Sequence, residues 1–172
     1  KTFVGLDAEE LSRVTKISHE TVLNDFLKNG EVSRTHALAA VSMIPQVRMT
    51  RRLCGAANLR KSDDGKLIFA SAGTFGSWKS RGPAYELPMG ALYGRKIKNL
   101  FAAGRCVSVE DDEMWDIARV IPVCAVTGEA AGVMAALYGD TGKIEPEKVQ
   151  GTLVSRGVKV HIEDCRKEKT NK

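Results

Sequence analysis

The chain has 172 residues, of which 43% are hydrophobic and 27% charged, proportions typical of an ordinary globular protein. These values exclude a wholly disordered chain, a collagen-like repeat and a small disulfide-stapled scaffold. Lysine and arginine outnumber aspartate and glutamate by 26 to 21, and the net charge of +5 permits anionic partners without requiring them. The chain starts at Lys1 without a signal-peptide pattern, so we expect it to be part of a longer protein.

The first predicted element is a helix that begins after Asp7 and ends before Gly30. Asp7 and Glu10 have the spacing of a capping box, and apolar residues follow at helical intervals. Ser18 is able to restart the helix, so one bent helix and two short ones both fit the pattern. A further short helix is expected across residues 37–41.

Three short strands are predicted in the middle of the chain. Residues 47–53 mostly alternate apolar with polar side chains, and residues 67–71 form a short apolar run. Residues 100–103 are continuously apolar, as buried strands are, and with Asn99 they form the third predicted strand. A turn at 61–65 and a glycine-rich loop at 73–83 are expected between the strands.

Two helices are predicted in the last third of the chain. The first covers 122–138, with proline in its first turn and Gly139 just past its end. The second is amphipathic, covers 145–155 and stops at Gly157. Residues 161–172 are expected to form a flexible basic tail.

Several kinds of site are excluded by missing motifs. No two of the 16 glycines are separated by one residue, so the G-x-G-x-x-G dinucleotide motif is absent. The four cysteines are scattered without zinc-type spacing, so we expect no metal site, and reduced thiols favour a cytoplasmic location. The most apolar stretch, 118–137, contains Arg119 and Glu129, so we interpret it as a buried helix and expect no membrane partner.

One contiguous pattern is able to form a ligand-binding site. The predicted strand at 99–103 ends at Gly104, where a missing Cβ would let a ligand lie over the strand end. The helix that follows has one face of small residues: Ala125, Gly128, Ala131, Gly132 and Ala135. Free backbone amides are expected at residues 123–125, where the helix dipole would stabilise an anion or an electron-rich carbonyl. Tight helix packing alone would also produce such a pattern.

Three stretches carry a family resemblance: YELPMGAL at 85–92, NLFAAGRCVS at 99–108 and IARVIPVCAVTGEAAG at 117–132. Together they resemble the C-terminal part of FAD-dependent oxidoreductases related to the fumarate reductase and succinate dehydrogenase flavoproteins. The relatives have a Pro-containing loop, then N-L-L-x-A-G-R-C-I-S, then S-I-R-V-x-P-x-C-x-A-x-G-x-A-A-G. Residues 47–55 and 145–157 resemble flanking elements of the same family more weakly.

The resemblance implies an α/β fold, namely a fragment of a Rossmann-like FAD-binding domain with helical remnants of a substrate domain. We therefore expect residues 1–45 to belong to a substrate or cap region and residues 46–139 to the FAD-binding domain. Residues 140–160 would form a C-terminal helix, followed by the tail. The family's adenosine-binding G-x-G-x-x-G unit is missing, so the expected partner is an N-terminal FAD-binding segment of the same parent chain, without which the fragment is expected to be inactive.

The resemblance also implies site residues. Gly104 and Arg105 would lie by the ribityl and pyrophosphate groups of FAD, and the backbone at 123–125 would face the pyrimidine edge of the flavin. The implied cofactor-binding residues are Gly104, Arg105, Pro122, Val123, Cys124, Ala125 and Gly128.

Arg119 stands where relatives carry an arginine for a substrate carboxylate, so it is the candidate catalytic residue. Pairing of Arg119 with Asp111, Asp112 or Glu113 is an equally weighted alternative. Glu86 and Arg105 are weaker candidates, named only because of where the resemblance puts them.

The implied function is hydride transfer between FAD and a small-molecule substrate, with a carboxylate-bearing substrate as one option. Two other functions stay open. Basic and aromatic residues interleaved at 48–98 would suit single-stranded nucleic acid, although we expect no nucleic-acid partner. A purely structural module that pairs with a second copy is the other alternative, and a homo-oligomer is compatible with both the structural and the enzymatic reading.

Overall fold

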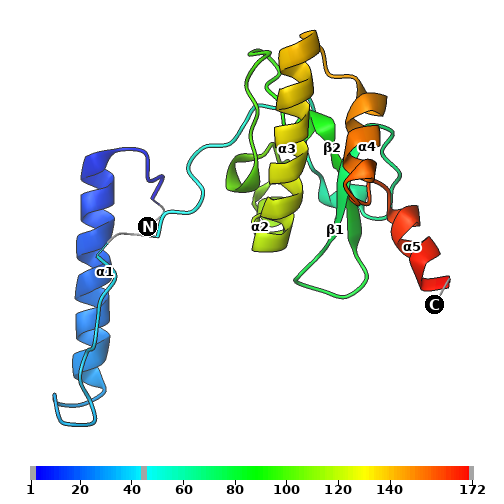
Figure 1. The fold of residues 1–172 in the computed structure, drawn as a ribbon. Helices are drawn as coiled ribbons and strands as arrows, with labels where there is room; N and C mark the ends of the chain where they lie inside the picture. Colours follow the sequence, from blue (N-terminus) through cyan, green and yellow to red (C-terminus); the bar gives the residue numbers. More distant parts are fainter. Residues whose placement is uncertain (1–2, 44–45, 171–172) are drawn as a thin grey trace. The chain divides into compact units, whose positions relative to one another are not determined.

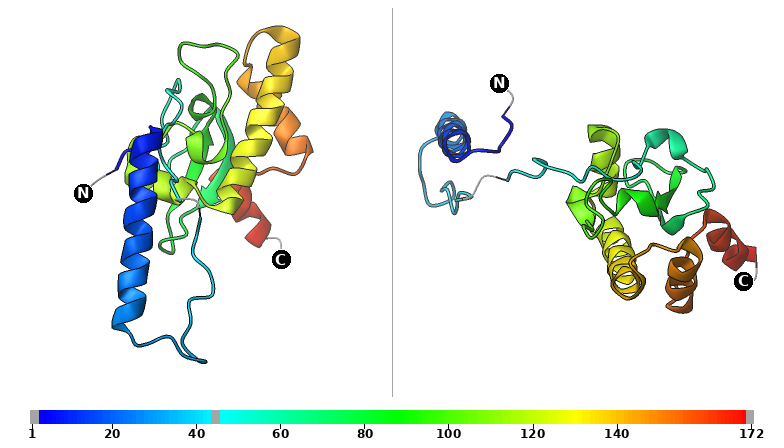
Figure 2. Two further views of the ribbon diagram at one scale, coloured as in Figure 1. Left: turned by 90° about the vertical axis from the view of Figure 1, so that its left-hand side faces the viewer. Right: turned by 90° about the horizontal axis from the view of Figure 1, so that it is seen from above.

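The computed structural model describes residues 3–43 and 46–170, with side chains described up to residue 166. The chain divides into two compact units, the first ending at Thr50 and the second beginning at Arg51. Figures 1 and 2 show both units.

The described part of the first unit contains one helix, α1 (Ala8–Lys28), which starts where the sequence predicts. The Asp7 side chain accepts a hydrogen bond from the Glu10 amide at 2.7 Å and so caps the helix. The Glu10 carboxylate in turn accepts the amides of Val4 and Gly5. The helix is continuous through Ser18, so of the two expected forms the single helix is correct. None of its residues is buried within the described part of this unit.

The helix predicted at 37–41 is wrong, because these described residues adopt no helical conformation. A tight turn precedes them, in which the Ser33 hydroxyl accepts the His36 amide at 3.1 Å. The His36 ring then stacks on Phe26 of α1, with 4.5 Å between ring centroids. His19 of α1 forms a hydrogen bond with the Ser42 carbonyl at 2.8 Å, which holds the extended segment 37–43 against α1. So short a helix would gain too few hydrogen bonds to offset its nucleation cost.

The second unit is built around an antiparallel hairpin of β1 (Ser71–Gly76) and β2 (Ala84–Pro88). The strand predicted at 67–71 is therefore wrong, because β1 begins where that strand was expected to end. The predicted glycine-rich loop supplies most of β1 instead. Gly73 explains the difference, since a Cβ there would lie 2.5 Å from Cγ1 of Val126. Glycine is needed at this position because a helix packs closely on the strand, and not because the chain turns there.

The strands predicted at 47–53 and 99–103 are also wrong. Their extended chain makes only isolated bridges nearby, Gly55 with Gly94 and Tyr93 with Phe101. A strand needs a hydrogen-bonded ladder with a partner, and the described residues offer these segments none. The unit is thus a mixed structure of helices and one small sheet, compatible with part of an FAD-binding domain, and the parallel sheet of a Rossmann-like domain is absent from the described residues.

Two long helices pack on β1, and they lie side by side in Figures 1 and 2. Helix α3 (Ile121–Thr141) has proline in its first turn, as predicted, but it continues through Gly139 to a left-handed cap at Gly142. Helix α4 (Pro146–Ser155) starts one residue later than predicted, ends where predicted, and buries Val149 and Leu153.

Two helices were not predicted. Helix α2 (Asp112–Ala118) is capped by Asp111, whose carboxylate accepts the Met114 amide at 2.8 Å. Helix α5 (Ile162–Thr170) forms where the sequence predicted a flexible tail, of which residues 171 and 172 lie outside the described residues. The start of α5 is fixed by the buried Glu86 of β2, which accepts the Ile162 amide at 2.9 Å. A tertiary contact therefore orders this segment.

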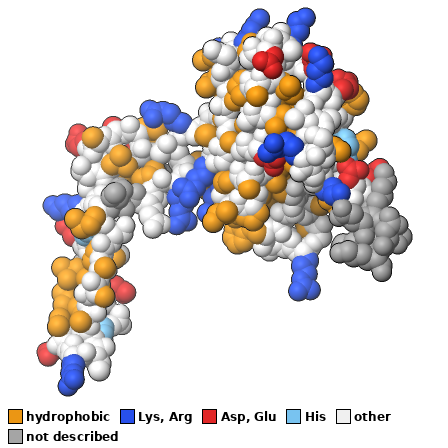
Figure 3. Space-filling view, in the orientation of Figure 1, with side chains coloured by type: hydrophobic (Ala, Val, Ile, Leu, Met, Phe, Trp, Pro, Cys, Tyr) orange, Lys and Arg blue, Asp and Glu red, His pale blue; other side chains and the backbone are white. Residues whose placement is uncertain are grey.

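Helix α3 is long and apolar enough to cross a membrane by length and composition alone, contrary to the expectation from sequence. Core helices of soluble proteins pass the same test. However, only 28% of its most apolar window is buried, and Figure 3 shows hydrophobic side chains exposed on this side of the second unit. The helix thus presents an uncovered apolar face.

Candidate functional site

The turn at Gly104 and the start of α3 are joined by one buried hydroxyl. Gly104 opens the short 3₁₀ helix η3 (Gly104–Cys106) with a φ of +65°, a conformation that favours glycine. Its amide donates to Oγ1 of the fully buried Thr127 at 2.9 Å, and that hydroxyl donates to the Cys124 carbonyl at 3.0 Å. The structure therefore brings together Gly104 and the first turns of α3, as the sequence predicts.

The start of α3 is open to solvent. Ile121 is 86% exposed, and Pro122, Ala125 and Gly128 are exposed as well. No side chain caps the helix at Val120. Of the predicted small-residue face, Gly132 and Ala135 are exposed, whereas Ala131 is buried. A Cβ at Gly128 would meet no atom within 4 Å, so this side of the helix has room for a flat ligand.

The expectation of free amides at residues 123–125 needs correction. The Cys124 amide donates to the Val120 carbonyl at 2.9 Å, and Ala125 follows it in the helical hydrogen-bond ladder. Val123 precedes the first such bond, so its amide has no partner four residues earlier in the helix, but the residue is only 2% exposed. The helix dipole still adds positive potential at this end.

Arg119 lies one residue before the cap of α3, at the end of α2, and is tied to a carboxylate that the sequence reasoning missed. Its Nε is 2.7 Å from Oδ1 of Asp116, so Asp111, Asp112 and Glu113 are not its partners. Its guanidinium also lies over the Trp115 ring, 5.3 Å from the centroid. The terminal guanidinium nitrogens make no hydrogen bond with the described residues and are available to a ligand.

Asp116 links Arg119 to the tip of the β1–β2 hairpin. Lys79 Nζ lies 2.7 Å from Oδ2 of Asp116, and Trp78 Nε1 donates to the Asp116 backbone carbonyl at 2.8 Å. The hydrogen bond from Lys79, followed by that from Arg119, lowers the pKa of the Asp116 carboxyl below its ordinary value. Two cations thus share one carboxylate, which leaves one positive charge unbalanced beside the start of α3. The spacing i, i+3 between Asp116 and Arg119 is the only sequence signal for this cluster.

The other two candidate side chains differ in their surroundings. Arg105 has an exposed side chain, while its carbonyl accepts a hydrogen bond from Trp115 Nε1 at 2.9 Å. Glu86 is 1% exposed and its carboxylate is occupied by Ile68, His161 and Ile162, so it is a structural residue and not a candidate acid or base.

A hollow of about 310 Å³ adjoins the open face of α3, lined by Thr74, Ala125, Val126, Glu129, Val158 and Lys159. A larger cavity lies at the opposite end of the helix. No group of three histidine, cysteine or acidic side chains among the described residues is arranged to hold a metal ion.

A comparison with protein families gives one match, to a family described as FAD dependent oxidoreductase, over residues 64–156. No curated protein and no solved structure matches the chain significantly. The matched range runs from the turn before β1 to the end of α4, and therefore contains the Gly104 turn, Arg119 and all of α3.

Proposed function

Because the chain belongs to the FAD dependent oxidoreductase family, whose match covers more than half of it, we propose that it transfers hydride between FAD and a small, carboxylate-bearing substrate. The family match through the Gly104 turn and α3 is the observation that carries the proposal. We assign the chain, within this family, to the relatives of fumarate reductase and succinate dehydrogenase flavoproteins. The motifs at 99–108 and 117–132 support that finer assignment.

The flavin end of FAD would lie over the Gly104 turn and the first turns of α3, which contact each other. The residues present fit the group, because Ala125 and Gly128 leave this face of the helix open. The first turn of α3 would face the pyrimidine edge of the ring, where the helix dipole would stabilise negative charge. Arg105 directly follows Gly104 and its side chain is exposed, so it would lie by the pyrophosphate. FAD, when bound, supplies the hydride acceptor.

Arg119 would hold the substrate carboxylate. Its Nε is fixed by Asp116 at 2.7 Å, which orients the guanidinium and leaves its terminal nitrogens to bind an anion. Lys79 offsets the charge of Asp116, so the cluster remains net positive when a substrate anion approaches. The role of this chain in the reaction is therefore to bind and orient, since it offers no side chain here that is a convincing acid or base.

The adenosine end of FAD would be held elsewhere. We propose that a further segment of the parent chain supplies the G-x-G-x-x-G unit and the strands that pair with residues 99–103, which completes a Rossmann-like sheet. That segment, or a second copy of the chain in a homo-oligomer, would cover the exposed face of α3. A cytoplasmic location and an inactive isolated fragment belong to the same proposal.

The test is flavin binding by the protein expressed from its complete gene. We expect a yellow protein whose flavin absorbance bleaches with dithionite. Ala125→Glu puts a carboxylate against the proposed ring site and should abolish flavin binding, although Glu near a helix start stabilises the helix. Ser62→Glu, at an exposed position outside α3, should retain the flavin. A folded but colourless wild-type protein, or equal flavin content in both variants, would contradict the proposal.

A further inference from the structure

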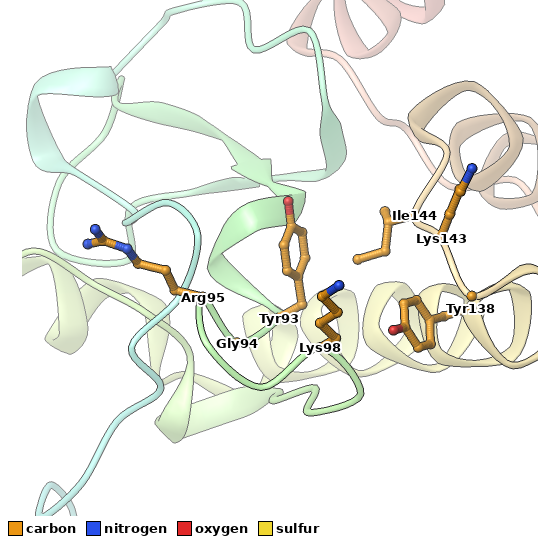
Figure 4. Close-up of a pocket in the computed structure, with 8 residues that line it drawn as sticks. Tyr93, Gly94, Arg95, Lys98, Tyr138, Lys143 and Ile144 are labelled. Carbon is orange, nitrogen blue, oxygen red and sulfur yellow. The ribbon is translucent and has the colours of Figure 1, made fainter.

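A second site lies at the C-terminal end of α3. A cavity of about 450 Å³ opens between the loop at 93–98, the last turns of α3 and the segment at 142–144 (Figure 4). This volume lies within the usual range for small-ligand sites, roughly 300–1,000 Å³. Since α3 has 21 residues, the cavity is separated from the proposed flavin end by about the length of the helix, roughly 30 Å.

Two tyrosines wall the cavity and are held in place by one phenylalanine. Tyr93 and Tyr138 both line it and are half-buried. Phe101 packs edge-on against Tyr138, with 5.7 Å between ring centroids, and its backbone bridges to Tyr93. Ile144 completes an apolar wall beside Tyr138. The aromatic surfaces are therefore formed before any ligand arrives.

The charged side chains that line the cavity are all basic, opposite in sign to the negative end of the α3 dipole. Arg95, Lys98 and Lys143 line it, and no acidic side chain does. None of these three cations forms an ion pair with the described residues, in contrast to Lys61, Lys79 and Lys148, which each pair with a carboxylate. In Figure 4, Lys98 lies between Tyr93 and Tyr138, Lys143 stands at the rim beyond Ile144, and Arg95 points outward.

We propose that this cavity binds a ligand that carries an aromatic ring and an anionic group, in the manner of a nucleoside monophosphate. The faces of Tyr93 and Tyr138 offer stacking surface to the ring. The ammonium groups of Lys98 and Lys143 suit a phosphate, which lysine binds as a point charge. This binding needs neither flavin nor the residues around Gly104, so it is independent of the proposed oxidoreductase function.

The test is calorimetric titration of the 172-residue protein with AMP, adenosine and inorganic phosphate at low ionic strength. We expect AMP to bind most tightly, because it alone engages both the rings and the cations. Lys98→Gln should weaken AMP binding about tenfold, as loss of one charge-assisted contact does. Tyr138→Leu should weaken it by a similar factor, about tenfold, through lost stacking.

Lys96→Gln is the matched control. Lys96 belongs to the same loop and its loss changes the net charge equally, but it lines a neighbouring cavity with Ile97 and Leu100. We expect this variant to bind AMP within about twofold of the unchanged protein, because exposed charges at a distance are screened. Absence of AMP binding, equal effects of the two lysine variants, or binding of adenosine or phosphate alone as tight as that of AMP would each overturn the proposal.

Discussion

Replacement of Glu86 by glutamine should destabilise the second unit far more than an ordinary loss of charge. The Glu86 carboxylate is 1% exposed and accepts the Ile68 amide at 2.7 Å, the Ile162 amide at 2.9 Å and His161 Nδ1 at 3.0 Å. It therefore fastens the loop before β1 and the start of α5 to β2. Both oxygens are needed, because the two backbone donors bind different ones.

Glutamine keeps the shape of the side chain but has only one acceptor oxygen. One backbone amide keeps its partner, while the other faces the glutamine NH₂, and a buried donor left unpaired costs about 1–3 kcal/mol. The remaining bond also loses its charge-assisted character, so we expect a total loss of about 2–4 kcal/mol in the free energy of unfolding. With a urea slope of about 1–3 kcal/mol per molar, the unfolding midpoint should fall by roughly 1–2 M.

The assay is urea unfolding followed by the fluorescence of Trp78 and Trp115, both of which belong to the second unit. Glu147→Gln is the control, because Glu147 is an exposed residue of α4 whose replacement should change stability by no more than about 0.5 kcal/mol. Amide hydrogen exchange at Ile162 should accelerate in the Glu86 variant alone. A Glu86→Gln protein as stable as the control would refute the structural role assigned to this carboxylate.

Three further outcomes follow from the packing and the charges. Gly73→Ala puts a Cβ 2.5 Å from Val126 Cγ1 and should cost about 1–3 kcal/mol by overpacking, measured in the same urea assay. Gly139→Ala should instead stabilise by about 0.4–1 kcal/mol, because a Cβ there meets no atom within 4 Å inside a helix. The Asp116 carboxyl should titrate in NMR below its ordinary pKa, and Lys79→Gln should raise that pKa by removing its main cause. A carboxyl whose pKa is lower in the folded than in the unfolded protein stabilises the fold at pH values above its unfolded-state pKa. The contribution of Asp116 should therefore be present at neutral pH and lost as the pH falls through its folded-state pKa.

Local signals allowed three of the five described α-helices to be predicted, and tertiary contacts explain most of the failures. The Asp7 cap and the prolines that open α3 and α4 act on neighbouring residues, so the starts of these helices could be read from the sequence. The strands could not be predicted in this way. Leu67 and Phe69 belong to an apolar run that suggests a buried strand, yet their exposed fractions are 67% and 74%. Burial there depends on what packs against the chain.

The candidate site was predicted in part for the same reason. Gly104 and the start of α3 belong to one contiguous motif, and the structure joins them through Thr127. Lys79 and Asp116 are 37 positions apart, and only the fold of the hairpin brings them together. Asp111 did carry a local capping signal for α2, but within a run of acidic residues it was not distinguishable from a solvated loop.

The central claim is that the open start of α3 and the Gly104 turn receive the flavin ring. NMR titration of the isotope-labelled protein with FAD measures this directly, since weak binding still displaces amide resonances. We expect the amides of Gly104, Arg105, Val123 and Cys124 to shift most, and Ala125→Glu to remove these shifts. Resonances that stay in place at saturating cofactor, or shifts confined to other parts of the chain, would contradict it.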